Sequence, residues 1–572
     1  PIQYLGMEAR EMKYLFNWNA PIIWSQHEPN TYYHAAQYLL RTRDLGQSWE
    51  EVSPDLTRNQ DDKQGKGGGP YTNEAVGAEN YGTISYVVES PHEAGVIWTG
   101  SDDGYVYLTR DGCKSWTNVT PKGLPECLIN AIEISPHDAA TAYIATTRYK
   151  FNDKRPAIYK TTNYGKSWTN ISKGIPGGAF TRVVREDNVR KDLLFAGTET
   201  GLYISWNGGQ QWHPFQLNLP VTPILDLIIR HDDVIAATSG RAFWVLDDLG
   251  LLRQHQPGLE GVKLYQPEDA FLVNGYSELD RTDENFKGTH PLRGVNPATG
   301  VVIYYQLPEL ADSVHIQLEV RDAAGQLVHA YSSEKDEDFH SYDGGPLPEP
   351  VLAKKAGLNR FVWNMRYPTM PGIPGVYIEG SYRGHKAGPG TYTLLLKTPE
   401  GEQSTTFRIK ANPLYPEDVD YAGYHQMMSE MEAKLTDMHR TVNALYAKKQ
   451  QMEEMLKQLP QETRFEAVRQ AGKALIRQIT AWDEEMVQRK SKAYDDVENF
   501  PNKFTANYLF LINHTESDIP RVNQPSRQRR AELDAQWEKL RARARELLDE
   551  RIPAYNEQLW KAGVGAVWAD EK

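Results

Sequence analysis

Alternating apolar and polar residues dominate the first 260 positions and predict short β-strands separated by polar turns. Segments 95–109 (GVIWTGSDDGYVYLT) and 192–205 (DLLFAGTETGLYIS) each contain two such strands, rich in aromatic and β-branched residues. A unit of this kind recurs along the chain, and its last copy occupies 226–248 (DLIIRHDDVIAATSGRAFWVLDD). Recurring four-stranded units are typical of β-propeller blades. We therefore expect a β-propeller portion of about five blades within residues 1–260.

Four copies of one short phrase mark the turn before the last strand of a blade. They are TRDLGQSW, TRDGCKSW, TTNYGKSW and SWNGGQQW. A short polar side chain in such a turn bonds nearby backbone, glycine accepts a positive φ, and tryptophan starts the next strand. We expect the four tryptophans to be largely buried. Structural roles in these turns are assigned to Asp44, Gly46, Trp49, Asp111, Trp116, Asn163, Gly165, Trp168, Asn207, Gly209 and Trp212.

These phrases resemble the Asp-box, or BNR, repeat of sialidases, xyloglucanase-type glycoside hydrolases and sortilin-like (VPS10-type) receptors. The copies are imperfect, because Cys113 stands where glycine is expected and Asn163 and Asn207 replace aspartate. Longer stretches, such as SPDLTRN (53–59) and ATSGRAFWVLDDLGLLRQ (237–254), resemble the C-terminal half of bacterial secreted BNR "glycosyl hydrolase" or sortilin-like proteins. The resemblance implies further blades upstream, and a secreted, periplasmic or outer-membrane-associated location.

The remaining chain changes its pattern twice. After a linker (261–295), alternation returns over 296–412, where short strands and turns predict a β-sandwich. The text AGLNRFVWNMR and GPGTYTLLL resembles the Ig-like module that follows the propeller in the same family. Over 413–572 apolar residues fall on three and four spacings, which predict an antiparallel helical bundle with a coiled-coil hairpin. The expected fold class is thus mainly β with an α C-terminal region.

Composition narrows the possible partners. The 572 residues include 63 Lys and Arg against 76 Asp and Glu, a net charge of −13, and no basic run suggests binding to nucleic acid. No stretch reaches the roughly 18 apolar residues of a membrane-spanning helix. The first residues show neither a signal-peptide core nor an initiating Met, so we expect a mature, cut or incompletely represented chain.

Metal, thiol and cofactor chemistry have little support in the sequence. Acidic residues follow His27, His92, His137 and His231, but each pair lies in the turn after the first strand of a different blade, so we expect structural turns and no metal site. Cys113 and Cys127 are expected at opposite ends of a blade and therefore free. The Met-rich helical stripe indicates packing, and we expect no cofactor.

Candidate ligand-binding residues come from the turns between the second and third strands, where members of the family bind ligands. They are Asp102, Asp103, Arg148, Tyr149, Glu199 and Arg241. Glycoside hydrolysis requires two carboxylates across a cleft, and the catalytic candidates are Asp103 and Glu199. The xyloglucanase-type resemblance implies two aspartates that face a cleft between two propellers, and half of that cleft would be absent here.

The expected function is a noncatalytic binding or scaffold protein of the bacterial cell envelope or exterior, with a glycan or peptide ligand. A glycoside hydrolase of the xyloglucanase-like propeller type is the first alternative, and a sortilin-like peptide receptor is the second. Because five blades leave two sheet edges open, we expect an upstream propeller half, a second protein chain or another copy of this chain to complete the ring.

Overall fold

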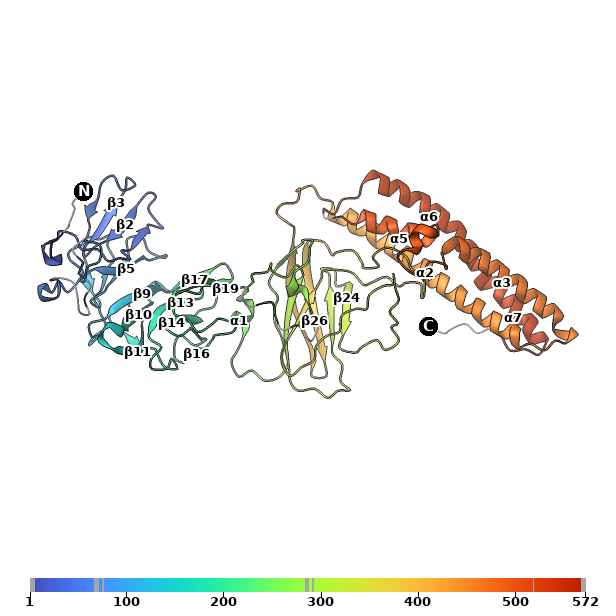
Figure 1. Cartoon of the computed structure of the whole chain (residues 1–572), viewed down its shortest axis with the longest axis horizontal. Coiled ribbons are helices and arrows are strands. Elements are labelled where there is room, and N and C mark those ends of the chain that lie inside the picture. Colours follow the sequence, from blue (N-terminus) through green and yellow to red (C-terminus); the bar gives the residue numbers. More distant parts are fainter. Residues whose placement is uncertain are drawn as a thin grey trace. The chain divides into compact units, whose positions relative to one another are not determined.

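The computed structural model describes residues 6–65, 71, 73–74, 77–282, 286, 288–290, 293–517 and 519–566 (Figure 1). The chain forms two compact units, Pro1–Leu259 and Glu260–Lys572. The first unit is almost entirely β-structure, and the second combines β-sheets with a helical region (Figure 1).

The first unit contains five successive antiparallel sheets, each built from strands that are consecutive in the chain. Blade one has β1 (Ile22–Trp24), β2 (Tyr32–Ala35), β3 (Leu39–Thr42) and β4 (Glu50–Glu51). Blade two has β5 (Ile84–Glu89), β6 (Ile97–Ser101), β7 (Val106–Thr109) and β8 (Thr117–Asn118). Blade three has β9 (Leu128–Ile134), β10 (Ala142–Arg148), β11 (Asp153–Thr161) and β12 (Thr169–Asn170). Blade four has β13 (Thr181–Glu186), β14 (Leu194–Thr198), β15 (Leu202–Ser205) and β16 (His213–Pro214). Blade five has β17 (Ile224–Arg230), β18 (Asp233–Thr238) and β19 (Phe243–Leu246).

Neighbouring blades pack through their inner strands. Strands β5, β9, β13 and β17 contact one another in sequence order, and β5 also contacts blade one. The apolar residues between the blades form continuous cores, for example from β10 through β14 to β18. No strand of blade five packs extensively on blade one within the described ranges, so the described blades leave the ring open. Short helices complete this unit: η1 (Ala9–Glu11), η2 (Asp61–Lys63), η3 (Tyr149–Phe151) and α1 (Gly250–Gln254).

The four repeated turns form the same hydrogen-bond network. In the first, Thr42 Oγ1 accepts a hydrogen bond from the backbone N–H of Gly46 (2.9 Å), and Asp44 Oδ1 accepts one from Ser48 N–H (2.9 Å). Corresponding bonds recur in the turns after β7, β11 and β15. Cys113 adopts a φ of +72° where the other three turns have glycine. Asparagine serves as well as aspartate because this bond needs only a side-chain oxygen.

The tryptophans of these turns differ in burial, contrary to our expectation that all four are largely buried. Trp212 is 1% exposed, Trp116 and Trp168 are half-buried, and Trp49 is 44% exposed. The indole N–H of Trp116, Trp168 and Trp212 donates to a backbone carbonyl of the preceding blade. Trp49 belongs to the first of the described blades, and no blade precedes it within the described residues.

The second unit begins with two sheets that share one apolar core. One sheet has the order β20-β22-β25 and the other β21-β27-β26-β23-β24. Their strands are β20 (Lys263–Leu264), β21 (Ala270–Phe271), β22 (Val301–Leu307), β23 (Gln317–Arg321), β24 (Leu327–Ser332), β25 (Gly357–Trp363), β26 (Gly390–Thr398) and β27 (Gly401–Lys410). Strands β20 and β21 and the short helix η4 (Glu278–Asp280) lie in the segment expected to be a linker, and both strands pair with the sheets.

The helical region forms one further core. Its elements are α2 (Tyr421–Gln458), η5 (Thr463–Phe465), α3 (Glu466–Met486), α4 (Asp496–Asn499), α5 (Phe504–Thr515), α6 (Gln524–Arg545), the π-helix η6 (Glu546–Arg551) and α7 (Ile552–Lys561). Helix α2 packs against α3 and α5 (Figure 1). Met428, Met431 and Met438 on its apolar stripe are fully buried. The methionines therefore pack the core, as their spacing predicts.

None of the helices in the described ranges is long and apolar enough to span a membrane. Both cysteines are free, as expected from their positions in blade two and in the connection after it. Burial raises the pKa of each thiol to about 12, so neither is an activated nucleophile.

Candidate functional site

One end of the first unit gathers the polar turns that connect the second and third strands of each blade. Because the strands are antiparallel, the inner strands begin at this same end, and the repeated turns lie at the other. A cavity of about 380 Å³ opens among these turns and strand starts. Its described lining consists of Asn17, Asn19, Tyr81, Asp102, Leu128, Asn130, Thr147, Arg148, Tyr149, Lys150, Phe151, Arg182 and Leu225.

Asp102 is the carboxylate in this described lining. Its Oδ1 accepts hydrogen bonds from the backbone N–H groups of Gly82 (3.0 Å) and Thr83 (2.8 Å), which tie the turn between β6 and β7 to the residues just before β5. Burial and the neighbouring Asp103 raise the pKa of Asp102 to about 7, despite those hydrogen bonds. A carboxyl group that holds its proton near neutral pH can act as a general acid.

Asp103, one residue further on, has different surroundings. Its side chain accepts from Ser101 Oγ (2.5 Å) and from the backbone N–H of Arg58 (2.7 Å). Asp103 is 1% exposed and is absent from the cavity lining. Burial raises the pKa of this carboxyl as well. These contacts give Asp103 a structural role in the turn. The two adjacent aspartates thus differ in their surroundings, because only Asp102 lines the cavity.

The other predicted residues divide in the same way. Arg148 and Tyr149 line the cavity, whereas Glu199 and Arg241 do not. Glu199 is bound by Arg182, whose Nε and Nη2 both donate to Glu199 Oε2 (2.9 and 2.7 Å). Arg241 is exposed in the turn before β19. The structure thus brings together Asp102, Arg148 and Tyr149, and it attaches Glu199 to their cavity through Arg182.

Several lining residues were missed from the sequence. Lys150 and Phe151 directly follow Arg148 and Tyr149 in the TTRYKF segment, so extending the predicted turn by two residues would have found them. Arg182 and Asn130 lie at the starts of the inner strands β13 and β9. An alignment of the blade units would have placed these strand starts beside the turns, because both belong to the same end of each blade.

At the opposite end of the blades, the histidines of the expected structural turns connect neighbouring blades. The ring Nε2 of His27, His92 and His137 lies 2.8–2.9 Å from the backbone carbonyls of Ser90, Ser135 and Asp187, respectively. Each acceptor belongs to the corresponding turn of the next blade. These rings are thus committed to blade packing, and no group of three or more potential metal ligands occurs in the described part of the chain.

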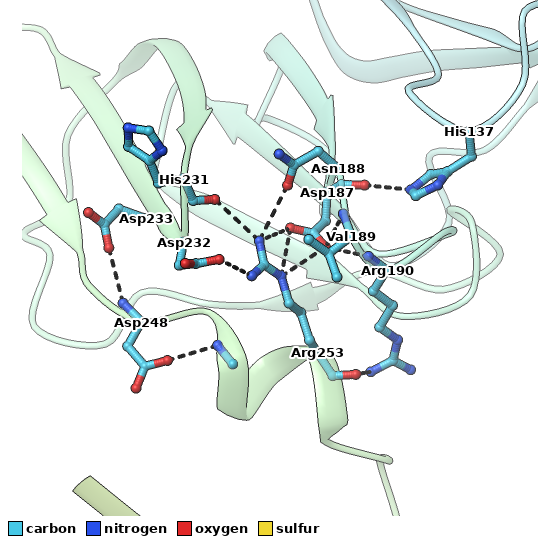
Figure 2. Close-up of polar contacts among 11 residues, drawn as sticks. His137, Asp187, Asn188, Val189, Arg190, His231, Asp232, Asp233, Asp248 and Arg253 are labelled. Carbon is cyan, nitrogen blue, oxygen red and sulfur yellow. Dashed lines mark hydrogen bonds and ion pairs between the residues drawn. The ribbon is translucent and has the colours of Figure 1, made fainter. Parts of the chain in front are cut away.

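Blade four has Val189 at the position of these histidines, and Arg253 from α1 makes the connection to blade five (Figure 2). Its guanidinium binds the carboxylate of Asp187 (2.9 Å), which is fully buried, and also that of Asp232. It reaches the backbone carbonyl of His231 as well (3.4 Å). Arg190 in turn donates to three carbonyls at the end of α1. This cluster of ion pairs and hydrogen bonds joins blade four to blade five, and we call it the Arg253 cluster.

The chain is similar in sequence to proteins that are named as xyloglucanases. No protein-family model matches the chain. A probable oligoxyloglucan-reducing end-specific xyloglucanase of Neosartorya fischeri is 23% identical over 406 residues, which cover 62% of this chain and 47% of the relative. The oligoxyloglucan-reducing end-specific xyloglucanase of Emericella nidulans is 26% identical over 249 residues, 38% of this chain and 30% of the relative. The matched part of the chain thus spans less than half the length of these curated relatives.

Among solved structures, a GH74 xyloglucanase from Xanthomonas campestris is similar, with 16% identity, coverage of 67% of this chain and 56% of that chain, and a TM-score of 0.31. A similarity at this level carries no argument about function. The curated sequence relatives correct the expected function. A noncatalytic scaffold is wrong as the main interpretation, because both curated relatives are named as xyloglucanases, which are enzymes.

Proposed function

We propose that the chain belongs to a glycoside hydrolase of the propeller type and that the cavity around Asp102 is part of its glycan-binding site. The observation that carries the proposal is a carboxyl group with a pKa raised to about 7 in a cavity lined by amides and aromatic rings. Glycan sites combine hydrogen-bonding side chains with apolar surface, and glycosidic bond cleavage needs an acid that is protonated near neutral pH.

The proposed roles differ from the pair named from sequence. Asp102 takes the part of the general acid, since it lines the cavity while Asp103 is enclosed by Ser101 and Arg58. Glu199 is the second carboxylate, the nucleophile or base, because it lies at the same end of the blades and is held by an ion pair with the cavity residue Arg182 (2.7 Å). The Asp-box type of the propeller and a secreted location are parts of the same proposal. No observation favours the sortilin-like alternative over it.

The test is release of reducing ends from a panel of soluble polysaccharides: xyloglucan, glucuronoxylan and polygalacturonate. We expect Asp102→Asn to lower the rate about 100-fold or more, since the amide cannot donate a proton to the leaving group. The unfolding midpoint should stay unchanged, because the amide oxygen still accepts from Gly82 and Thr83. The parent rate should fall as pH rises through about 7, where Asp102 loses its proton.

Two controls sharpen this experiment. Arg241→Gln alters an exposed residue at the same end of the blades that does not line the cavity, and it should leave the rate within about twofold of the parent. Asp103→Asn should lower the unfolding midpoint, since the buried carboxylate loses its complementary contacts. A parent chain that cleaves none of the three polysaccharides, or an Asp102→Asn variant with full activity, would overturn the proposal.

A further inference from the structure

A loop of the second unit connects the apolar core of the two sheets with that of the helices. Residues 366–389 lie between β25 and β26, and their Met370 and Tyr382 belong to the helical core, whereas Ala387 belongs to the core of the sheets. His385 is fully buried where the loop passes from one core to the other. A buried imidazole needs hydrogen-bond partners, and helix α2 provides them.

Two side chains of α2 form a hydrogen-bonded chain with His385. The backbone N–H of His385 donates to Glu432 Oε1 (2.7 Å), and His385 Nδ1 lies 2.9 Å from Glu432 Oε2. Because a carboxylate only accepts hydrogen bonds, this Nδ1 carries a proton. His425 precedes Glu432 by two helical turns and lies on the same face of α2. Its Nδ1 is 2.8 Å from His385 Nε2.

The bond between the two imidazoles contains one proton. In the neutral pair, His425 donates to His385 Nε2. After the pair takes up one proton, His385 is the cation beside Glu432 and donates to His425 Nδ1. After a second proton, both facing nitrogens carry hydrogen, so two cationic N–H groups point at each other and the bond is lost.

The surroundings of the pair also oppose the second charge. Burial and the neighbouring His385 lower the pKa of His425, and they outweigh the carboxylates of Glu432 and Asp322, which favour its protonation. Tyr367 stacks on both rings, with centroids 4.5 and 5.1 Å away. The titratable and charged groups around the pair are Tyr421, Tyr424, Glu432 and Arg440 of α2, Asp322 of the β23–β24 turn, Arg366, Tyr367 and Lys386 of the loop, and Glu516 after α5, which pairs with Arg366.

We propose that the Glu432–His385–His425 chain is a pH-sensitive latch between the 366–389 loop and helix α2, closed while the two imidazoles carry at most one positive charge and open when acid protonates both. On opening, His425 turns away into the cavity of about 510 Å³ that it lines. The buried His385 then loses one of its hydrogen bonds, and the loop is held less firmly on α2. This inference does not depend on the proposed function.

The test is backbone hydrogen exchange of the whole 572-residue chain, followed by mass spectrometry at pH 7.5 and about pH 4.5, on either side of the ordinary histidine range. Rates are corrected for the chemical effect of pH on exchange. We expect the segment around His385 to exchange about tenfold faster at the lower pH, because the loop loses one hydrogen bond to a charged group.

Two variants of the chain separate the latch from a structural contact. In His425→Asn the amide can donate to His385 or accept from it but takes up no proton, so the exchange rates at the two pH values should agree within about twofold. Glu432→Gln removes the charge that favours the first proton, and the acceleration should therefore begin at higher pH.

Two further histidines serve as controls. His514 is exposed on α5, next to the Asn513 that binds Ser381 of the same loop, and His514→Gln should keep the response of the parent. His439 binds the carbonyl of Pro371, also in this loop, so the measurements are repeated in His439→Gln. The segment around His385 should still respond to acid in that variant.

Thermal unfolding at pH 7.5 identifies any variant that misfolds, and the parent chain alone already tests the latch. A parent whose segment around His385 exchanges equally at both pH values would overturn the inference. The same acceleration in His425→Asn as in the parent would do so as well, because the second imidazole would then have no part in it.

Discussion

The tryptophans of the repeated turns occupy equivalent positions, but we expect them to contribute different amounts to the free energy of unfolding. Trp212 is 1% exposed and donates its indole N–H to the carbonyl of Ile171 (2.6 Å), while Trp49 is 44% exposed. Trp212→Ala should therefore lower the free energy of unfolding by about 3–5 kcal/mol, through lost burial and a new cavity. Trp49→Ala should cost about 1 kcal/mol or less. Urea unfolding measures both, and equal losses would contradict this account.

The buried His439 predicts acid sensitivity in the second unit. His439 on α2 donates from Nδ1 to the carbonyl of Pro371 (2.6 Å), and its Nε2 has no partner in the described structure. Burial lowers the pKa of His439 from 6.5 to about 4. Between these two values the unfolded chain binds the proton and the folded chain does not, so stability decreases as pH falls.

The expected loss is about 3 kcal/mol between pH 7 and pH 4, from about 2.5 pKa units. In His439→Gln the amide N–H can still donate to Pro371, but nothing titrates at this position. Unfolding free energies of the parent and the variant are measured at both pH values. The parent should lose about 3 kcal/mol more than the variant between pH 7 and pH 4. Parallel pH profiles would show that His439 has the same pKa in the folded and the unfolded chain.

At the scale of elements, the short helix α1 stabilises blade five through the Arg253 cluster, in which Arg253 binds Asp187 and Asp232 (Figure 2). Asp187 is fully buried, and Arg253 is its cationic partner. Arg253→Gln leaves this carboxylate without its counter-charge and should lower the free energy of unfolding by about 3–5 kcal/mol. The double variant Arg253→Gln, Asp187→Asn should recover part of the loss, since no buried charge is left.

A surface pair provides the comparison. Arg464 and Glu462 form an exposed ion pair at 2.8 Å, and Arg464→Gln should change stability by less than about 1 kcal/mol. If the Arg253 variant loses no more stability than this control, water or Arg190 compensates the charge of the buried Asp187 carboxylate. Chemical denaturation of the whole chain, followed by the fluorescence of its tryptophans, gives these values.

At the scale of the whole first unit, the described ring is open and both ends expose apolar side chains. Ile22 and Trp24 are exposed on β1, and Ile228, Phe243 and Val245 are exposed on one face of blade five. Exposed patches of this kind mark interaction surfaces. We expect the purified chain to self-associate through them in the absence of additional blades.

Light scattering coupled to size exclusion tests this expectation at two protein concentrations. The parent chain should show a mass above that of a monomer, and the fraction should rise with concentration. Phe243→Lys with Val245→Thr places a charge and a hydroxyl on the exposed face and should shift the chain towards monomer. A monomer at every concentration would contradict the expectation.

The amino-acid sequence by itself determined the parts of the structure that depend on local patterns. Period-two alternation gave the blade strands, and the three and four spacing gave helix α2 with its buried methionines. The repeated turns could also be predicted, because their hydrogen bonds join residues no more than four positions apart, as in Thr42 to Gly46. Such features need no knowledge of distant neighbours.

Only the tertiary structure decided which residues share the cavity. Asp102 and Asp103 are adjacent and chemically identical, yet Arg58, 45 positions away, encloses one of them while the other lines the cavity. Arg182 and Lys150 enter the same cavity because blades three and four pack side by side. The exposure of Trp49 likewise follows from its place in the first of the described blades, where no described blade covers it. These outcomes depend on contacts between residues far apart in the chain, which periodicity and composition do not record.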